Sequence, residues 1–204
     1  MTISVVLVDA DGVIQQSSPG WRSRWGRLID DETLTDAFLA EIFEMERPFL
    51  CGGEGFKSEL AKILERWGCS DCVDEALRIW TMIDPCEEIL SIVRSLRTLG
   101  LTLGLATNQQ AYRFQYMSEE LAYADIFDHC FVSCEMGASK PSQAYFQEII
   151  RRVACPARDI LFIDDHQSNV DAARVAGMAA EQFSLDLGPD NMRRLLQRHG
   201  ISVT

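Results

Sequence analysis

The chain has 204 residues, and its 31 acidic against 19 basic side chains give a formal net charge of −12. This balance argues against nucleic-acid or anionic-membrane partners, which need a basic surface, but allows a small anionic ligand held by a few local cations. No segment has the length and apolarity of a membrane span, and no basic region precedes an apolar stretch near the N-terminus. Seven scattered cysteines favour a reducing compartment, so we expect a cytoplasmic protein.

The chain begins with an apolar run over residues 3–8 that stops at Asp9-Ala10-Asp11-Gly12. Such a run predicts a strand buried on both faces, which brings two carboxylates to the edge of a parallel sheet. Alone, this pattern is equally compatible with a strand followed by a plain turn. A polar turn is expected over residues 15–20.

Residues 21–83 show only helical periodicity, in three apolar stripes with no strand pattern between them. Asp84-Pro85 closes this region, because a residue before proline disfavours the helical conformation. Cys69 and Cys72 have the spacing of a metal or redox pair, but no second pair follows at zinc-site spacing. We therefore expect a helical insertion with no metal site of its own.

From residue 87 onward, helical and strand patterns alternate. The expected strands cover 101–106, 130–133, 160–163 and 179–183. This alternation predicts an α/β fold with a Rossmann-like parallel sheet and helices on both faces. Because the helical stretch interrupts the sheet after its first strand, we predict a discontinuous core of residues 1–15 and 87–204. Residues 16–86 would form a helical cap domain.

Polar residues follow four of these predicted elements. They are Asp9 and Asp11, Thr107 and Asn108, Lys140 before Pro141, and Asp164 and Asp165. Ligands of open parallel sheets bind beyond the carboxyl ends of the strands, so these side chains are expected to share one pocket.

The chemistry of this set points to phosphoryl transfer. Carboxylates placed together repel one another, and Mg²⁺ relieves this repulsion while keeping sites for water and phosphate. Thr107 and Asn108 offer donors to phosphate oxygens, and Lys140 offers a full positive charge at an expected helix start. A carboxylate nucleophile, a metal and a fixed cation are the parts that phosphoryl transfer needs.

In order and spacing, these motifs resemble the haloacid dehalogenase (HAD) superfamily of hydrolases. The resemblance includes Asn169-Val-x-Ala-Ala173 after the last aspartate pair, and it covers the predicted core. Residues 107–177 look similar to the branch of sugar-1-phosphate phosphatases and epoxide hydrolase phosphatase domains. Several members of that branch lack an aspartate at the position of Asp11, which this chain keeps. Metal-independent dehalogenases lack it too, so Asp11 argues against a dehalogenase.

The resemblance implies a role for each residue of the site. Asp9 would attack phosphorus, and Asp11 would protonate the leaving oxygen and then accept a proton from water. Magnesium would bind the Asp9 carboxylate, the Asp11 carbonyl and Asp165, with Asp164 bound directly or through water.

Of the remaining residues, Thr107, Asn108 and Lys140 would hold the phosphoryl group, and Asn169 would steady the lysine or the metal ligands. The expected activity is a Mg²⁺-dependent phosphatase that acts on a small phosphorylated metabolite through an aspartyl-phosphate. A sugar phosphomutase and a non-catalytic phosphate-binding regulator are the alternatives.

Substrate specificity is expected from the cap. Trp21 and Trp25 lie four residues apart among arginines, and Glu46-Arg47-Pro48 follows the next helical stripe. Trp21, Trp25 and Arg47 are candidates for a wall around a phosphorylated metabolite. A plain amphipathic cap helix with solvated arginines explains the same pattern.

Overall fold

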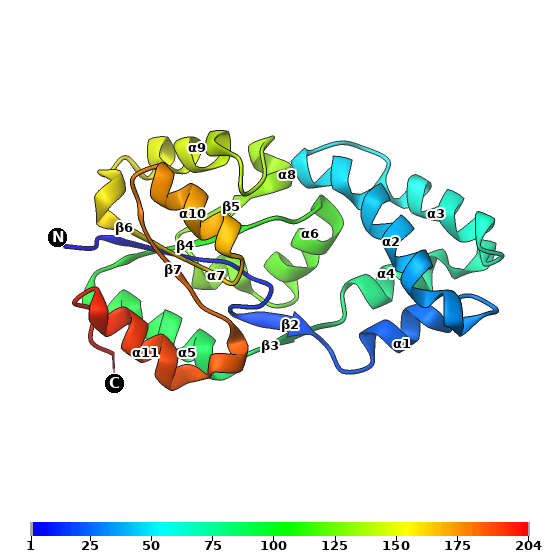
Figure 1. Cartoon of the computed structure of the whole chain (residues 1–204), viewed down its shortest axis with the longest axis horizontal. Coiled ribbons are helices and arrows are strands. Elements are labelled where there is room, and N and C mark those ends of the chain that lie inside the picture. Colours follow the sequence, from blue (N-terminus) through cyan, green and yellow to red (C-terminus); the bar gives the residue numbers. More distant parts are fainter. Residues whose placement is uncertain (1, 204) are drawn as a thin grey trace.

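The computed structural model describes residues 2–203 and contains an α/β core beside a helical cap (Figure 1). The core is built on a parallel sheet with strand order β5-β4-β1-β6-β7. Its strands are β1 (Val5–Val8), β4 (Thr102–Thr107), β5 (His129–Val132), β6 (Ile160–Asp164) and β7 (Ala179–Gln182). The apolar run that opens the chain therefore forms the central strand, as its continuous apolarity predicts.

Helices cover both faces of the sheet, because side chains alternate along each strand. Val6 and Val8 face one apolar core, whereas Val5 and Leu7 face the other. The first face is covered by α5 (Glu87–Leu96), α6 (Ala111–Glu119), α7 (Tyr123–Ile126) and α11 (Pro189–Arg198). The second is covered by α9 (Gln143–Val153) and α10 (Gln167–Val175), with the short α8 (Ser133–Met136) at its edge. The predicted α/β fold is thus confirmed.

The cap contains α1 (Trp21–Gly26), α2 (Thr35–Glu46), α3 (Phe56–Arg66) and α4 (Val73–Trp80). These helices bury an apolar core of their own, centred on aromatic residues such as Trp25 and Phe38. Short 3-10 turns join elements of the chain: Glu32–Leu34, Arg47–Cys51, Ser70–Cys72, Arg97–Leu99, Ala157–Asp159 and Leu185–Leu187. Cys69 and Cys72 are paired in a disulfide at one of them. Within residues 2–203, no helix combines the length and the apolarity that crossing a bilayer requires.

Two strands connect the cap to the core, where the sequence suggested a polar turn and a helix end. Strands β2 (Gln15–Ser17) and β3 (Ile83–Pro85) pair antiparallel, with Gln16 opposite Asp84. We call this pair the β2–β3 ribbon; it crosses between the two parts in Figure 1. The expectations of a polar turn over residues 15–20 and of a helical region up to residue 83 are wrong at these strands, because strands of three residues are too short to show the apolar alternation by which a strand is recognised.

Smaller differences concern helices of the core. The helix expected to open at Lys140-Pro141 begins at Gln143, where the Ser142 hydroxyl accepts from the Ala144 amide. Lys140 therefore lies in the loop before α9 and not at its first turn. The short helices α7 and α8 have no predicted counterpart, since four-residue helices carry too little periodicity to detect.

Candidate active site

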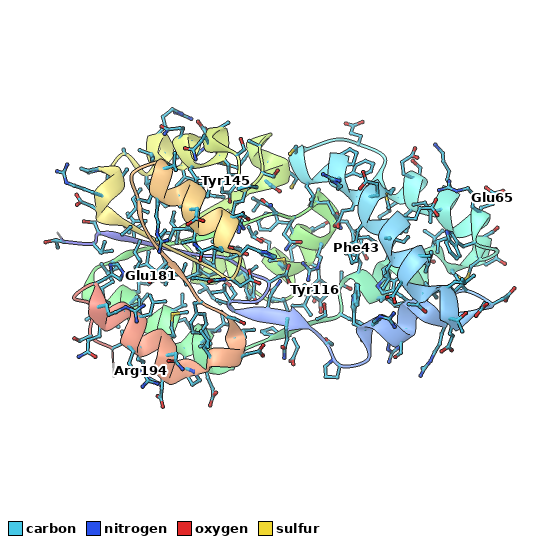
Figure 2. All side chains as sticks on the ribbon, in the orientation of Figure 1. Phe43, Glu65, Tyr116, Tyr145, Glu181 and Arg194 are labelled. Atoms are coloured by element: carbon cyan, nitrogen blue, oxygen red, sulfur yellow. A yellow bond between two sulfur atoms is a disulfide. The ribbon has the colours of Figure 1, made fainter. Side chains whose placement is uncertain are left out.

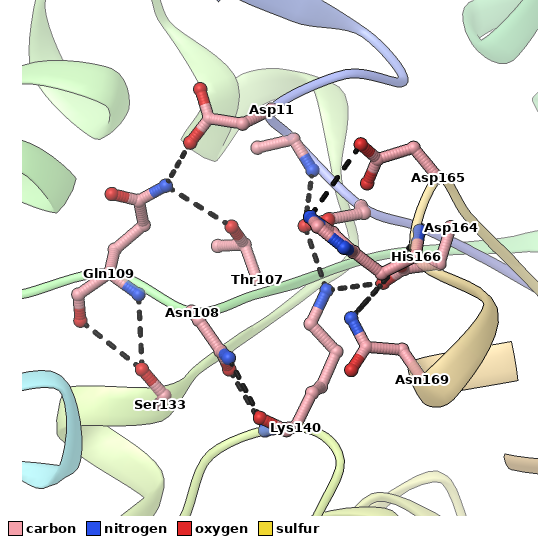
Figure 3. Close-up of polar contacts among 12 residues, drawn as sticks. Asp11, Thr107, Asn108, Gln109, Ser133, Lys140, Asp164, Asp165, His166 and Asn169 are labelled. Carbon is pink, nitrogen blue, oxygen red and sulfur yellow. Dashed lines mark hydrogen bonds and ion pairs between the residues drawn. The ribbon is translucent and has the colours of Figure 1, made fainter. Parts of the chain in front are cut away.

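The carboxyl ends of the three central strands bring the predicted residues to one edge of the sheet. Asp9 directly follows β1, Thr107 ends β4 and Asp164 ends β6. Lys140 joins them from the loop before α9 (Figure 3). A cavity of about 280 Å³ is lined by Asp9, Asp11, Gly12, Thr107, Asn108, Lys140, Asp165, His166 and Asn169. The structure thus assembles residues that are more than 150 positions apart in the chain into one pocket.

A buried lysine lies at the centre of the site. The Nζ atom of Lys140 is 2.9 Å from Oδ1 of Asp9 and 2.6 Å from Oδ2 of Asp164, and 1% of the lysine side chain is exposed. Burial raises the pKa of Asp9 to about 7, although the lysine opposes the shift. Two carboxylates thus compete for one ammonium, and the nearby Asp165 adds a third acidic group.

The acidic groups fit a divalent metal ion. Ligand atoms of Asp9, Asp164 and Asp165 all lie within 4.8 Å of one another. One oxygen of Asp165, Oδ1, is buried and has no hydrogen-bond partner. An unpaired buried carboxylate oxygen is costly unless it binds a cation. This oxygen makes Asp165 the better placed direct ligand, because Asp164 is already engaged.

Three donors hold Asp164 in place. Besides Lys140, the Nδ2 atom of Asn169 donates to Asp164 over 2.9 and 3.1 Å, and the backbone amide of His166 donates over 2.8 Å. Asn169 therefore steadies the partner of the lysine, in line with the supporting role predicted for it. The His166 side chain is 72% exposed and lies at the rim.

Asn108, which lines the cavity, also holds the lysine loop. Its Oδ1 atom accepts from the backbone amide of Lys140 at 2.9 Å, and its Nδ2 atom donates to the Lys140 carbonyl at 3.0 Å. These paired bonds fix the lysine loop against the end of β4. The Asn108 side-chain amide is thus used for positioning, while the Thr107 hydroxyl still faces the cavity and accepts from Gln109.

Asp11 is bound through both carboxylate oxygens by residues that the sequence did not suggest. Arg113 donates to its Oδ2 at 2.6 Å and to its Oδ1 at 2.9 Å, and Gln109 and Gln15 donate as well (Figure 3 shows Gln109). Burial opposes ionisation, but Arg113 and these donors outweigh it and lower the pKa of Asp11 to about 2. Gln109 precedes α6 and Arg113 lies in its first turn, where the Nη1 atom of Arg113 donates to the Oε1 atom of Gln109 at 2.8 Å.

Of the three cap residues predicted to contact the substrate, only Trp21 lines a cavity. Trp21 lines a second cavity beside the site, but Trp25 is fully buried in the cap core against Trp80. Arg47 pairs with Glu44 at 3.0 Å, and its side chain is 71% exposed. Trp25 is therefore part of the cap core, and Arg47 is a solvent-exposed surface residue. Glu46, the neighbour of Arg47, lines the second cavity instead.

Gly12 lets Asp165, the predicted metal ligand, approach the end of β1. Its φ is +78°, and a Cβ atom added there would overlap Oδ2 of Asp165. We expect Gly12→Ala to displace the Asp165 carboxylate and to weaken Mg²⁺ binding by roughly tenfold or more, as loss of a ligand-orienting contact does. Isothermal titration with Mg²⁺ measures this affinity.

Gly100→Ala is the matched control for this variant. Gly100 also has a left-handed backbone, with φ +76°, but an added Cβ would meet nothing within 4 Å. This variant should share the backbone penalty of about 1–2 kcal/mol and keep wild-type Mg²⁺ affinity. Equal Mg²⁺ affinities in the two variants would show that Gly12 does not shape the metal site.

Comparison with known protein families identifies the class. Residues 3–177 match the model of the haloacid dehalogenase-like hydrolases, so the chain belongs to this family of hydrolases. A HAD family enzyme from Bacteroides thetaiotaomicron, solved in complex with magnesium and inorganic phosphate, superposes with a TM-score of 0.73 at 18% identity, over 88% of this chain and 93% of that one. At this identity the likeness supports the fold alone.

Individual relatives include phosphatases. A phosphatase of Mycobacterium tuberculosis, MT3486, is 28% identical over 201 residues, which cover 88% of this chain and 87% of the relative. A drimenol cyclase of Aspergillus calidoustus is 36% identical over 80% of this chain and 31% of its own length. A sesquiterpene phosphatase of Aspergillus oryzae is 30% identical over 46% of this chain and 48% of its own length. The chain thus spans half or less of these last two proteins.

Proposed function

We propose that the protein is a Mg²⁺-dependent phosphatase that hydrolyses a small phosphorylated metabolite. The observation that carries this proposal is the juxtaposition of Asp9, Lys140 and Asp165 in one cavity, with a buried carboxylate oxygen left unpaired. The order of motifs over 107–177 also supports a place near the sugar-1-phosphate phosphatases and epoxide hydrolase phosphatase domains.

The first chemical step belongs to Asp9. Its Oδ1 atom is held by the Ala10 amide at 2.7 Å and by Lys140, which leaves the second carboxylate oxygen to attack phosphorus. The bond from phosphorus to the ester oxygen breaks, and an aspartyl-phosphate forms. Bound Mg²⁺ would neutralise phosphoryl charge. Lys140 supplies a fixed positive charge in a buried setting, where electrostatic stabilisation is strongest.

The proton transfers are assigned to Asp11. It would donate a proton to the departing alkoxide and then accept one from the water that attacks the aspartyl-phosphate, which releases inorganic phosphate and regenerates Asp9. In the structure, Arg113 and Gln109 bind the Asp11 carboxylate. In this arrangement the pKa of Asp11 is about 2, so Asp11 must first bind a proton in place of one of its two hydrogen bonds from Arg113 before it can donate to the ester oxygen. The β2–β3 ribbon begins at Gln15, four residues after Asp11.

A phosphate-release screen tests the proposed function. Phosphate monoesters with anionic, neutral and apolar leaving groups are incubated with 5 mM Mg²⁺ or with chelator. We expect hydrolysis only with Mg²⁺, and acid-quenched mass spectrometry should find phosphate on Asp9. Metal-independent hydrolysis, or no hydrolysis of any ester, would contradict the proposal. Turnover that requires a sugar bisphosphate activator would favour the phosphomutase alternative.

A further inference from the structure

A second cavity, of about 440 Å³, opens directly from the phosphate site between the core and the cap. Asp11, Gly12 and Asn108 line both cavities. When the phosphoryl group of an ester lies at Asp9, the leaving group of that ester therefore extends into the second cavity. We call it the leaving-group cavity; its volume is within the range of small-molecule pockets.

One wall of the leaving-group cavity is apolar and comes from the cap. Trp21 stacks on Phe43 with ring centroids 6.1 Å apart and an interplanar angle of 15°. Trp80 packs edge-on against the buried Trp25 at 5.2 Å, which fixes its position, and Leu50 completes the wall. Phe43 remains 45% exposed on the side of the cap that faces the core (Figure 2). Covering this aromatic surface with an apolar group of a ligand lowers the free energy of the complex.

The charges of the leaving-group cavity disfavour a second anion. Of the described residues that line it, Arg113 is the one cation. Four of its five N–H groups already have protein acceptors, which are both oxygens of Asp11, the Gln109 side chain and the Trp80 carbonyl. The other titratable lining residues, Asp11 and Glu46, are acidic, and burial raises the pKa of Glu46 to about 7, so that Glu46 is negatively charged above neutral pH. A carboxylate or second phosphate on the substrate would find no free cation there.

We propose, on the basis of the phosphatase function above, that the substrate is a monophosphate ester of an apolar alcohol that carries no second anionic group. The aromatic wall binds the hydrocarbon part, and the saturated Arg113 with its acidic neighbours excludes substrates with a carboxylate tail.

Matched esters test this proposal. Propyl phosphate, hexyl phosphate and hexyl phosphate with a terminal carboxylate are compared by kcat/KM in Mg²⁺. We expect kcat/KM to rise by about two- to fourfold per added methylene between propyl and hexyl. The carboxylate should lower it by roughly tenfold or more relative to hexyl phosphate, since like charges would face each other. No rise with chain length, or a preference for the carboxylate ester, would overturn the proposal.

Variants locate the effect in this cavity. Phe43→Ala should reduce the ratio of hexyl to propyl kcat/KM by about fivefold. Glu46→Gln should raise activity on the carboxylate ester at pH 8, where Glu46 is negatively charged. Leu34→Ala, which truncates another exposed apolar side chain of the cap, should change neither the rates nor the ratio. An unchanged ratio in Phe43→Ala would overturn the assignment of the wall.

The two proposals fail in different ways. Mg²⁺-dependent hydrolysis of all three esters at equal kcat/KM would overturn the apolar substrate class and leave the phosphatase function standing. Absence of hydrolysis of every ester, together with no phosphate on Asp9, would overturn both.

Discussion

Asp9→Asn is expected to lower the rate of phosphate release by about 10³-fold or more, while the metal-free protein remains as stable as the wild type or becomes more stable. The amide cannot act as the nucleophile, but its oxygen still accepts from the Ala10 amide. Lys140 keeps Asp164 as a partner, so the buried ion pair that remains is neutral overall. Phosphate release and the thermal midpoint in chelator measure the two effects.

The stability effect of Asp9→Asn has a defined pH dependence. Burial raises the pKa of Asp9 in the folded protein from 3.8 to about 7, so the folded state binds this proton more tightly than the unfolded chain. The contribution of Asp9 to the free energy of unfolding therefore falls as pH rises between these values. The advantage of the asparagine variant in chelator should be larger at pH 8 than at pH 5.

Asp186→Asn is the control for these measurements, because Asp186 is exposed and outside the site. It should change neither the turnover rate nor the pH dependence. Full activity of Asp9→Asn would exclude Asp9 as the nucleophile. A large drop in the thermal midpoint of Asp9→Asn would show that the attraction between Asp9 and Lys140 stabilises the fold by more than the repulsion between Asp9 and Asp164 destabilises it.

Lys140→Met is expected to destabilise the protein by about 3–5 kcal/mol and to abolish turnover. The methionine fills a similar volume but leaves Asp9 and Asp164 buried without a counter-charge. Chemical denaturation in chelator measures the loss. In the wild type, burial alone would lower the pKa of Lys140, but the two aspartates raise it above its ordinary value, so the lysine is charged at neutral pH.

A double-mutant cycle identifies the cause of this loss. Adding Asp164→Asn to Lys140→Met removes one of the two uncompensated charges, so the double variant should be more stable than the sum of the single effects predicts. Lys62→Met, at an exposed ion pair with Glu59, should cost at most about 1 kcal/mol. Additive effects in the cycle would show that Lys140 stabilises the fold through packing and not through charge.

Much of the core and the site was predictable because the signals are local. A continuous apolar run in the sequence predicts a buried strand, and Asp9, Thr107 and Asp164 each mark the end of such a run. Parallel topology then requires these ends to meet at one edge of the sheet. This inference needs neither the packing of side chains nor the exact bounds of helices.

The parts that were missed depend on contacts that no local pattern records. Arg113 binds Asp11 across 102 positions of the chain, and Asn108 turns to the Lys140 backbone across 32. In the cap, Trp21 and Trp25 have the same sequence signal, and the packing of α1 on α2 and α4 decides which of them is buried. Periodicity identifies an apolar helix face but does not tell which residue at its edge meets a cavity.

The β2–β3 ribbon makes the cap a modular attachment. Because Ser17 and Ile83 are cross-strand partners, everything between them is in topological terms the loop of one enlarged hairpin. Replacing a two-residue turn by residues 18–82 adds only about 3 kcal/mol of loop-closure entropy, since this cost grows with the logarithm of length. The apolar core that the cap buries within itself offsets such a cost. Segments of very different size can thus be exchanged at these two strands while the register of the catalytic sheet is preserved.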